Sequence, residues 1–313
     1  MKKAIIMALA VCLTMTACEK EAWSEDEEPT SDVVLPDGSV AKTKKFTFTM
    51  KGDFSGDWKS ADGIDGQKTK QAARRTAGYL AADGRDMTDV WVLDYMNGVL
   101  VQQVHQDDNT ADDFGKPVLN LALGSHHIYF VASRGTGATL NTIEKTITWS
   151  TVADTFWKDY EVNVVATSNG NRAVTLDRAV TKLRLTVTDA IADGAATFNV
   201  APHTWYYGLN YQTGAPAAAQ TDGVITINIP ANMIGATNTP LNIFSFSSTT
   251  EWTTDVALNC KASNNDVLGS ATIENVPFVR NRVTDYSGPL FGSGGSLTLS
   301  LNTDWLDAAT GTW

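Results

Sequence analysis

The sequence predicts an all-β protein made of β-sandwiches, on three observations. From about residue 45 onward, apolar and polar residues alternate with a period of two, as in strands that bury one face. Gly, Asn, Asp and Pro interrupt these runs at short intervals, which is typical of the turns between strands. Helical periodicity is almost absent between the runs, so sandwiches are favoured over alternating α/β units.

The first expected strand covers residues 46–51, where Phe and Met alternate with Thr. A later run with Trp91, Leu93 and Tyr95 leads into Asn97-Gly98, a dipeptide that favours a type I′ hairpin turn. The strand at residues 99–104 would return from that turn. Further strands of this first series are expected at 118–123, 127–132, 146–149 and 160–166.

A second series of strands begins near Ala173. The turn at Ser168-Asn169-Gly170-Asn171 separates the two series. A chain of 313 residues can fill two cores better than one, so we expect an N-terminal sandwich at 45–171 and a C-terminal sandwich at 172–313. The expected strands of the second series are 174–176, 183–187, 196–200, 225–229, 241–246, 256–260, 271–273 and 297–301.

One long segment lies between the first and second expected strands. Residues 67–80 are rich in Ala, Lys and Arg, but they form no apolar stripe and Gly78 interrupts them. We expect an exposed loop or a weak helix there. Loops of this length are often functional or disordered.

The N-terminal residues have the features of a lipoprotein signal. Lys2 and Lys3 precede an apolar run at 4–13, which is shorter than the roughly 20 residues of a membrane-spanning helix. The sequence LTMTAC at 13–18 looks like a bacterial lipobox, in which the cysteine, Cys18, is acylated and becomes the first residue. We therefore expect a signal peptide at 1–17 and a lipidated flexible tether at 18–44. The acidic run after Cys18 resembles the export signal of lipoproteins on the surface of Bacteroidetes-type outer membranes.

Charge and cysteine content exclude several classes of protein. The formal net charge is −11, and the chain has no clustered basic surface of the kind that nucleic acid requires. Of the three cysteines, Cys12 leaves with the signal peptide and Cys18 would be acylated, so no intrachain disulfide is expected. Cys260 alternates with polar neighbours and is expected to be a small buried apolar residue.

Motifs for catalysis are missing from the sequence, so we expect no enzyme, no cofactor and no metal site. It contains no G-x-S-x-G, P-loop, H-E-x-x-H or paired C-x-x-C motif. His126 and His127 are adjacent, so in a strand they point to opposite faces and cannot share a metal ion. The aspartates at 107–108 and 112–113 lack the order of a calcium loop and are expected to form a solvated turn. The sequence GSGG at 292–295 is expected to form a flexible link or a turn.

Three segments resemble the fimbrillin-like proteins of Bacteroidales type V pili. These are MTDVWVLDYMNG at 87–98, LDRAVTKLRL at 176–185, and VPFVRNRVT at 276–284 with the glycine-rich link and terminal strand that follow. The resemblance implies two transthyretin-like Greek-key β-sandwiches in tandem, a lipoprotein of the outer membrane, and assembly with other pilus subunits by donor-strand exchange. In such exchange, a strand of one subunit fills the groove that a removed first strand leaves in the next.

The resemblance also implies a processing step. In shaft subunits of the family, a trypsin-like protease cuts at an arginine in the loop after the first strand, and Arg74 and Arg75 stand in that loop here, with Arg85 as a lesser candidate. The alternative is that these arginines only keep the loop soluble. The tail after Leu301 has no sustained alternation and would make a poor donor strand, so an anchor or minor subunit of the fimbrium is favoured over a shaft subunit.

A different class of function rests on aromatic residues. The chain has nine tryptophans, and Trp205, Tyr206, Tyr207 and Tyr211 could form an exposed face that stacks on sugars. These residues are also ordinary core residues of sandwiches. A surface glycan-binding lipoprotein is therefore the alternative to a pilus component.

Overall fold

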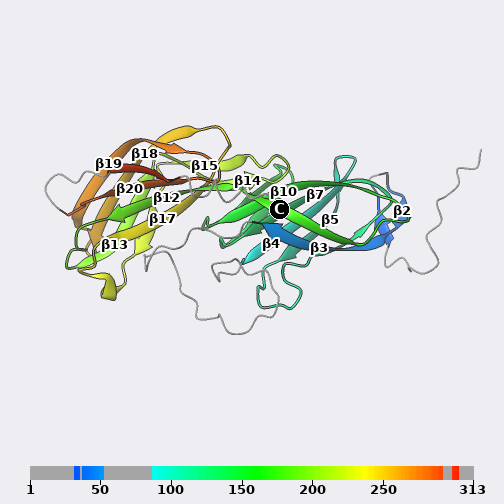
Figure 1. The fold of residues 1–313 in the computed structure, drawn as a ribbon, viewed down its shortest axis with the longest axis horizontal. Helices are drawn as coiled ribbons and strands as arrows, with labels where there is room; N and C mark the ends of the chain where they lie inside the picture. The colour runs from blue at the N-terminus through cyan, green and yellow to red at the C-terminus, as the bar shows by residue number, and fades with distance from the viewer. Residues whose placement is uncertain (1–31, 36, 53–86, 292–297, 303–313) are drawn as a thin grey trace, which may run out of the picture.

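The computed structural model describes residues 32–35, 37–52, 87–291 and 298–302, and its fold is all-β as the sequence predicts (Figure 1). The molecule is elongated, with the strands of the first half at one end and those of the second half at the other. A single 3-10 turn, η1 (Ala231–Met233), is the helical element of the described part. Within that part, no helix is long and apolar enough to cross a bilayer.

The first half is built on one seven-stranded sheet. A small hairpin of β1 (Asp32–Val34) and β2 (Val40–Lys42) precedes it. In spatial order, the sheet contains β5 (Val99–Gln106), β4 (Asp89–Met96), β7 (Gly124–Ser133), β10 (Thr155–Val164), β11 (Asn171–Arg178), β3 (Lys44–Gly52) and β6 (Val118–Leu121).

This sheet curls until its two edges approach each other. The backbone N–H of Asn120 on edge strand β6 donates a hydrogen bond of 3.0 Å to Gln102 Oε1 on edge strand β5. The curled sheet encloses one core, to which β3, β4, β7 and β10 contribute inward-facing side chains such as Phe48, Val92 and Phe130. Alternate residues of each strand point inward, as the period-two pattern predicts.

The β4–β5 hairpin confirms the local turn prediction. Asn97 and Gly98 have φ angles of 49° and 78°, as the two central residues of a type I′ turn require. The dipeptide therefore fixes the register of this hairpin.

The second half is a sandwich of two four-stranded sheets. Leu183 and Leu185 of one sheet pack against Phe198 and Leu258 of the other, in a continuous apolar core. The first sheet is β17 (Thr239–Phe246), β12 (Val180–Val187), β20 (Val283–Gly288) and β21 (Thr298–Asn302); the second is β16 (Ile225–Asn228), β13 (Ala195–Pro202), β18 (Trp252–Ala262) and β19 (Val267–Phe278).

A fourth sheet joins the two halves. Its strands are β15 (Pro216–Thr221), β14 (Thr204–Asn210), β9 (Thr146–Thr148) and β8 (Thr139–Asn141), so it combines segments from both sides of residue 171. Ile147 and Leu209 from this sheet, with Trp149 just after β9, pack on the outer face of the seven-stranded sheet, where Leu93 and Val131 lie. The seven-stranded sheet is thus covered on both faces in this region.

An ion pair fixes the junction between β11 and β12. Arg178, the last residue of β11, makes two hydrogen bonds to the buried carboxylate of Asp154, of 2.7 and 3.1 Å. It also donates to Asn281 Oδ1, at 3.0 Å, from the loop before β20. Strand pairing places β11 in the first sheet, so the chain changes sheets between Arg178 and Val180. The division into 45–171 and 172–313 stays a prediction.

Candidate functional site

The feature of the fold that suggests a function is the position of β3. This strand lies between β11 and β6, and it is parallel to β11 but antiparallel to β6. Strand β11 follows β3 by more than a hundred residues, so their pairing is not part of a hairpin. Residues 53–86, which carry the chain from β3 towards β4, lie outside the described part of the structure.

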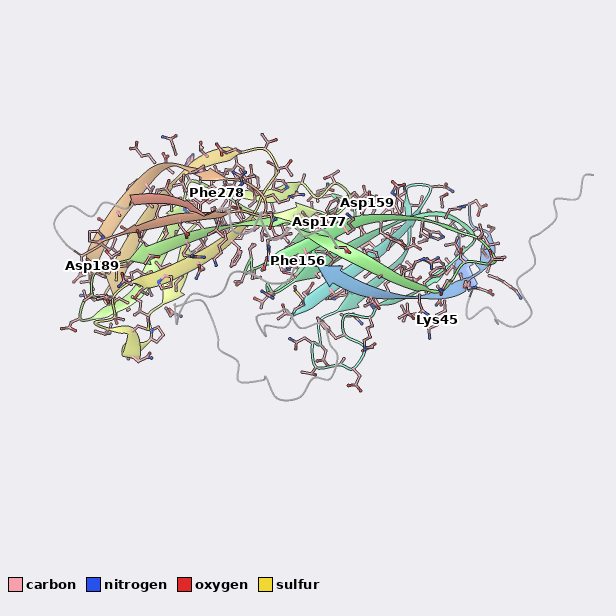
Figure 2. All side chains as sticks on the ribbon, in the orientation of Figure 1. Lys45, Phe156, Asp159, Asp177, Asp189 and Phe278 are labelled. Atoms are coloured by element: carbon pink, nitrogen blue, oxygen red, sulfur yellow. The ribbon has the colours of Figure 1, made fainter. Side chains whose placement is uncertain are left out.

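The side chains of β3 alternate between the core and the surface. Phe46 and Phe48 are fully buried and Met50 is nearly so, whereas Lys45 and Thr49 are exposed (Lys45 is labelled in Figure 2). The prediction of a first strand with one apolar face is confirmed.

Phe48 lies at the middle of β3, in the groove between β11 and β6 that this strand fills. Its ring centroid lies 5.2 Å from that of Phe130 and 6.1 Å from that of Tyr160, the second contact being edge-to-face. The Arg172 guanidinium of β11 lies 5.2 Å from the Phe46 ring centroid. These aromatic contacts are of the kind that contributes energy beyond burial alone.

The backbone of β3 forms hydrogen bonds to residues just before β11 and just before β6. The N–H of Thr47 donates to the carbonyl of Gly170 at 2.7 Å, and the N–H of Phe48 donates to the carbonyl of Pro117 at 3.0 Å. A Cβ atom on Gly170 would collide with the carbonyl oxygen of Lys45, so glycine is needed at this approach. Gly170 therefore has a packing role besides its role as a turn residue.

The groove would be unstable if it were empty. Burial of two Phe side chains and one Met side chain contributes roughly 5–9 kcal/mol at the usual 1.5–3 kcal/mol per residue. Loss of β3 would also leave the backbone groups of β11 and β6 unpaired along the groove. A protein that loses this strand needs another apolar strand in its place.

The predicted modification sites lie outside the described residues. These are Cys18, the predicted lipidation site, and Arg74 and Arg75, the predicted processing sites. The glycine-rich link at 292–295 also lies outside. The aspartates at 107–113 are described, and they form hydrogen-bonded turns in which Asp108 Oδ1 accepts from the Thr110 backbone N–H at 2.9 Å.

The structure contradicts the alternative of an exposed sugar-stacking face at Trp205 and confirms the interpretation of Trp205 as a core residue. Trp205 and Tyr211 are fully buried, because β14 is covered on both sides by other sheets. The Trp205 indole N–H donates to the Phe244 carbonyl at 2.8 Å, and its ring packs edge-on against Phe278, 5.3 Å away. Tyr206 faces the opposite core, so the aromatic run does not form one face.

His126 forms a buried polar pair at one end of the first core. Its Nδ1 lies 2.8 Å from Asp94 Oδ1, and its Nε2 lies 3.0 Å from the Ala122 carbonyl. Burial alone would lower the pKa of His126, but the hydrogen bond and charge of Asp94 raise it above its ordinary value. Burial raises the pKa of Asp94. The pair therefore retains a proton more strongly than the same two groups would in water.

Cys260 is a buried residue of β18, as the sequence predicts. Burial raises the pKa of its thiol to about 11, so the thiol stays protonated at neutral pH. It serves as an apolar residue of the second core.

Three solved structures show what the chain is similar to. A candidate adhesin from Bacteroides ovatus has 10% identity and a TM-score of 0.46, covering 87% of this chain and 96% of its own. A candidate polysaccharide-binding protein from Bacteroides thetaiotaomicron has 11% identity and a TM-score of 0.49, covering 83% and 96%. A tip fimbrial protein from Porphyromonas gingivalis has 13% identity and a TM-score of 0.41, covering 82% and 99%.

No family model and no curated protein sequence matches the chain. The structural likenesses above are too distant to carry an argument about function.

Sequence reasoning missed one cluster of side chains of metal-ligating types. His127 of β7 lies beside Asp159 and Glu161 of β10, on the outer face of the seven-stranded sheet. The signal was present in part, because Asp159 and Glu161 are two residues apart and share one face of a strand. The register that brings His127 to them joins strands about 30 residues apart and could not be read from either strand alone.

Proposed function

We propose that this protein is a structural component of a type V fimbrium, most simply a lipid-anchored anchor or minor subunit, in a system that assembles by β-strand exchange. The observation that carries the proposal is the groove between β11 and β6. A single apolar strand fills it, and that strand makes no hairpin with either neighbour. The role is not catalytic.

The chemistry of the groove suits an exchanged strand. A donor would regain the backbone hydrogen bonds of β11 and β6 along its length, and alternate apolar side chains would enter the sites of Phe46, Phe48 and Met50. Any sequence with apolar residues at every second position meets these requirements. The groove therefore selects for strand pattern more than for individual residues.

The role of the chain depends on whether it is cut within residues 53–86. A chain cut at Arg74 or Arg75 would lose the lipid at Cys18 together with β3, and its open groove would accept a strand from another subunit. An uncut chain keeps β3 in its own groove and stays in the outer membrane through the lipid. It would then end the fimbrium at the cell surface.

The test is the intact mass and N-terminal sequence of the protein recovered from its native cell surface, with and without trypsin-like proteases. We expect a chain that starts at acylated Cys18 in both cases, and a Cys18→Ala variant that is no longer held by the membrane. A chain that starts after Arg74 or Arg75 would assign it to the polymerising subunits instead. Recovery of a non-acylated chain that still starts at Cys18 would contradict lipid anchoring.

Arginine substitutions would test the alternative in which a protease processes the chain. If cutting occurs, an Arg74→Ala/Arg75→Ala double variant should stay uncut, and Arg85→Ala should be cut as the parent is. If the double variant is cut like the parent, the processing site lies elsewhere.

A further inference from the structure

Three metal-ligating side chains meet on the outer face of the seven-stranded sheet, and the proposed function does not use them. In the antiparallel pairing of β7 with β10, His127 stands opposite Glu161, and Tyr129 stands opposite Asp159 (labelled in Figure 2). Residues opposite each other across two strands share a face, so His127, Asp159 and Glu161 all project to the same side.

The distances between the three groups suit a bound ion better than they suit hydrogen bonds. His127 Nδ1 lies 3.5 Å from Asp159 Oδ1 and 3.8 Å from Glu161 Oε1, and the three ligand atoms lie within 4.8 Å of one another. Both distances from the imidazole are longer than an ordinary N–H···O bond of about 2.7–3.2 Å. An ion held tetrahedrally with bonds of about 2.0–2.2 Å separates its ligand atoms by about 3.3–3.6 Å. Small side-chain rotations would close this set around one ion.

The orientation of Asp159 gives independent support. Its Oδ1, the atom that faces His127 Nδ1, is shielded from solvent and accepts no hydrogen bond within the described part of the chain. A shielded carboxylate oxygen without a partner is costly, and a cation would satisfy it.

The local field also favours a cation. Asp159 and Glu161 place two carboxylates on this face, next to Tyr129. Lys158, which directly precedes Asp159, pairs with the Asp177 carboxylate at 3.0 Å. Its charge is therefore directed towards Asp177 rather than towards the two acids.

We propose that His127, Asp159 and Glu161 form a surface site for a divalent transition-metal ion of the zinc class. One imidazole and two carboxylates are ligands that zinc accepts, whereas calcium and magnesium prefer oxygen ligands throughout. Three protein ligands leave a fourth position open for water or for a ligand from a binding partner. This proposal stands apart from the proposed function and does not depend on it.

The strands provide a rigid base for the site. The β7–β10 pairing is continuous over ten residue pairs, from Thr155 with Ser133 to Val164 with Gly124. Ligands on paired strands keep their spacing better than ligands on loops do. The three side chains are 48%, 34% and 75% exposed for His127, Asp159 and Glu161, so an ion can reach them and substitutions there should not unfold the protein.

The test is calorimetric titration of the full chain, prepared without a histidine tag, with zinc chloride. We expect one ion per chain, and a melting temperature that rises with zinc concentration because the folded state alone holds the site. His127→Ala, Asp159→Asn and Glu161→Gln should each weaken binding by at least about tenfold, since loss of even a group that orients a ligand costs about 10–100-fold. Acidification should also weaken binding, because protons compete for the imidazole.

His203 provides a matched control. It is an exposed histidine whose Nδ1 lies 2.7 Å from Asp222 Oδ1, and no third ligand joins this histidine–carboxylate pair among the described residues. His203→Ala should bind zinc as the parent does. The proposal would be overturned if His127→Ala retained the parent's affinity, if His203→Ala lost it, or if the parent bound no zinc at about 100 μM. Calcium binding that depends on Asp159 and Glu161 but not on His127 would also overturn the zinc assignment.

Discussion

The first strands of the two halves, β3 and β12, occupy the same place in their sheets. Strand β3 is antiparallel to β6 and parallel to β11, and β12 is antiparallel to β17 and parallel to β20. Both strands send alternate apolar side chains into the core beneath them. The same pairing pattern is therefore used twice along the chain.

The two strands differ in how the chain continues from them. Strand β12 follows β11 after one residue, Ala179, whose N–H donates to the Thr155 carbonyl at 2.8 Å. Strand β3 is instead linked to β4 through residues 53–86, and no described strand continues it directly. The proposed strand exchange would therefore apply to β3, whereas β12 is tied directly to β11.

The largest expected change in the free energy of unfolding comes from truncating a core side chain under either strand. Phe48→Ala should destabilise the protein by about 3–5 kcal/mol and Leu185→Ala by about 2–5 kcal/mol, because both side chains are fully buried. Hydrogen exchange should separate them: Phe48→Ala should release mainly β3 and its neighbours β6 and β11, and Leu185→Ala the second sandwich. The exposed Thr49→Ala variant should change the free energy of unfolding by no more than about 0.5 kcal/mol. Equal exchange across the whole chain in both variants would contradict the distinction.

The junction between β11 and β12 can be tested by substituting Asp154. Asp154→Asn should cost about 3–5 kcal/mol, because it leaves the buried Arg178 guanidinium without its carboxylate. The measurement is denaturant unfolding. Lys158→Ala, which breaks an exposed pair with Asp177, should cost at most about 1 kcal/mol. An Asp154→Asn variant as stable as the parent would show that Arg178 does not fix this junction.

The close approach at Gly170 should matter for β3 alone. Gly170→Ala places a Cβ against the Lys45 carbonyl and should cost about 1–3 kcal/mol, as overpacking does. Limited proteolysis should then detach β3 at protease concentrations that leave the parent intact. If β3 stays protected from the protease, the backbone at Gly170 tolerates a Cβ atom better than the short distance to the Lys45 carbonyl implies.

The stabilities of the two cores are also expected to depend differently on pH. The pKa values of His126 and Asp94 are both raised in the folded state. At a pH between a group's pKa in the unfolded state and its pKa in the folded state, the folded state therefore binds more protons than the unfolded state. The contribution of Asp94 should fall as pH rises above about 3.8 and that of His126 as pH rises above about 6.5, each by at most about 1.4 kcal/mol per pH unit for one proton.

The control for the pH effect is a variant without the titrating groups. A His126→Gln/Asp94→Asn double variant should lose this slope while keeping polar groups at both positions. The second core contains Cys260, whose pKa of about 11 keeps it protonated throughout this range. Stability that rises from pH 6.5 to pH 8.5 in the parent alone would contradict the expected direction of the slope.

Local features of the sequence predicted much of this fold. The Asn97-Gly98 turn depends on two adjacent residues, and the alternation in β3 depends on one strand, so both could be read directly. The groove itself could be anticipated only through a family resemblance, because the β3–β11 pairing joins distant segments.

Contacts between distant segments explain what the sequence alone did not predict. The sequence left Trp205 open between a surface aromatic and a core residue, because nothing in its strand shows that β14 lies between two cores. His127 looked unpaired because its partners lie on β10. The sheet that combines β8 and β9 with β14 and β15 likewise depends on pairing across the two halves, which strand patterns do not encode.

The most direct test of an exchangeable first strand is peptide replacement. The full chain would be nicked within residues 53–86 by a site-specific protease and mixed with a labelled peptide of residues 44–52. We predict saturable incorporation of this peptide, and none of a peptide in which Phe46 and Phe48 are replaced by serine. If the nicked protein never exchanges β3, or takes up both peptides equally, the groove is not a strand-exchange site.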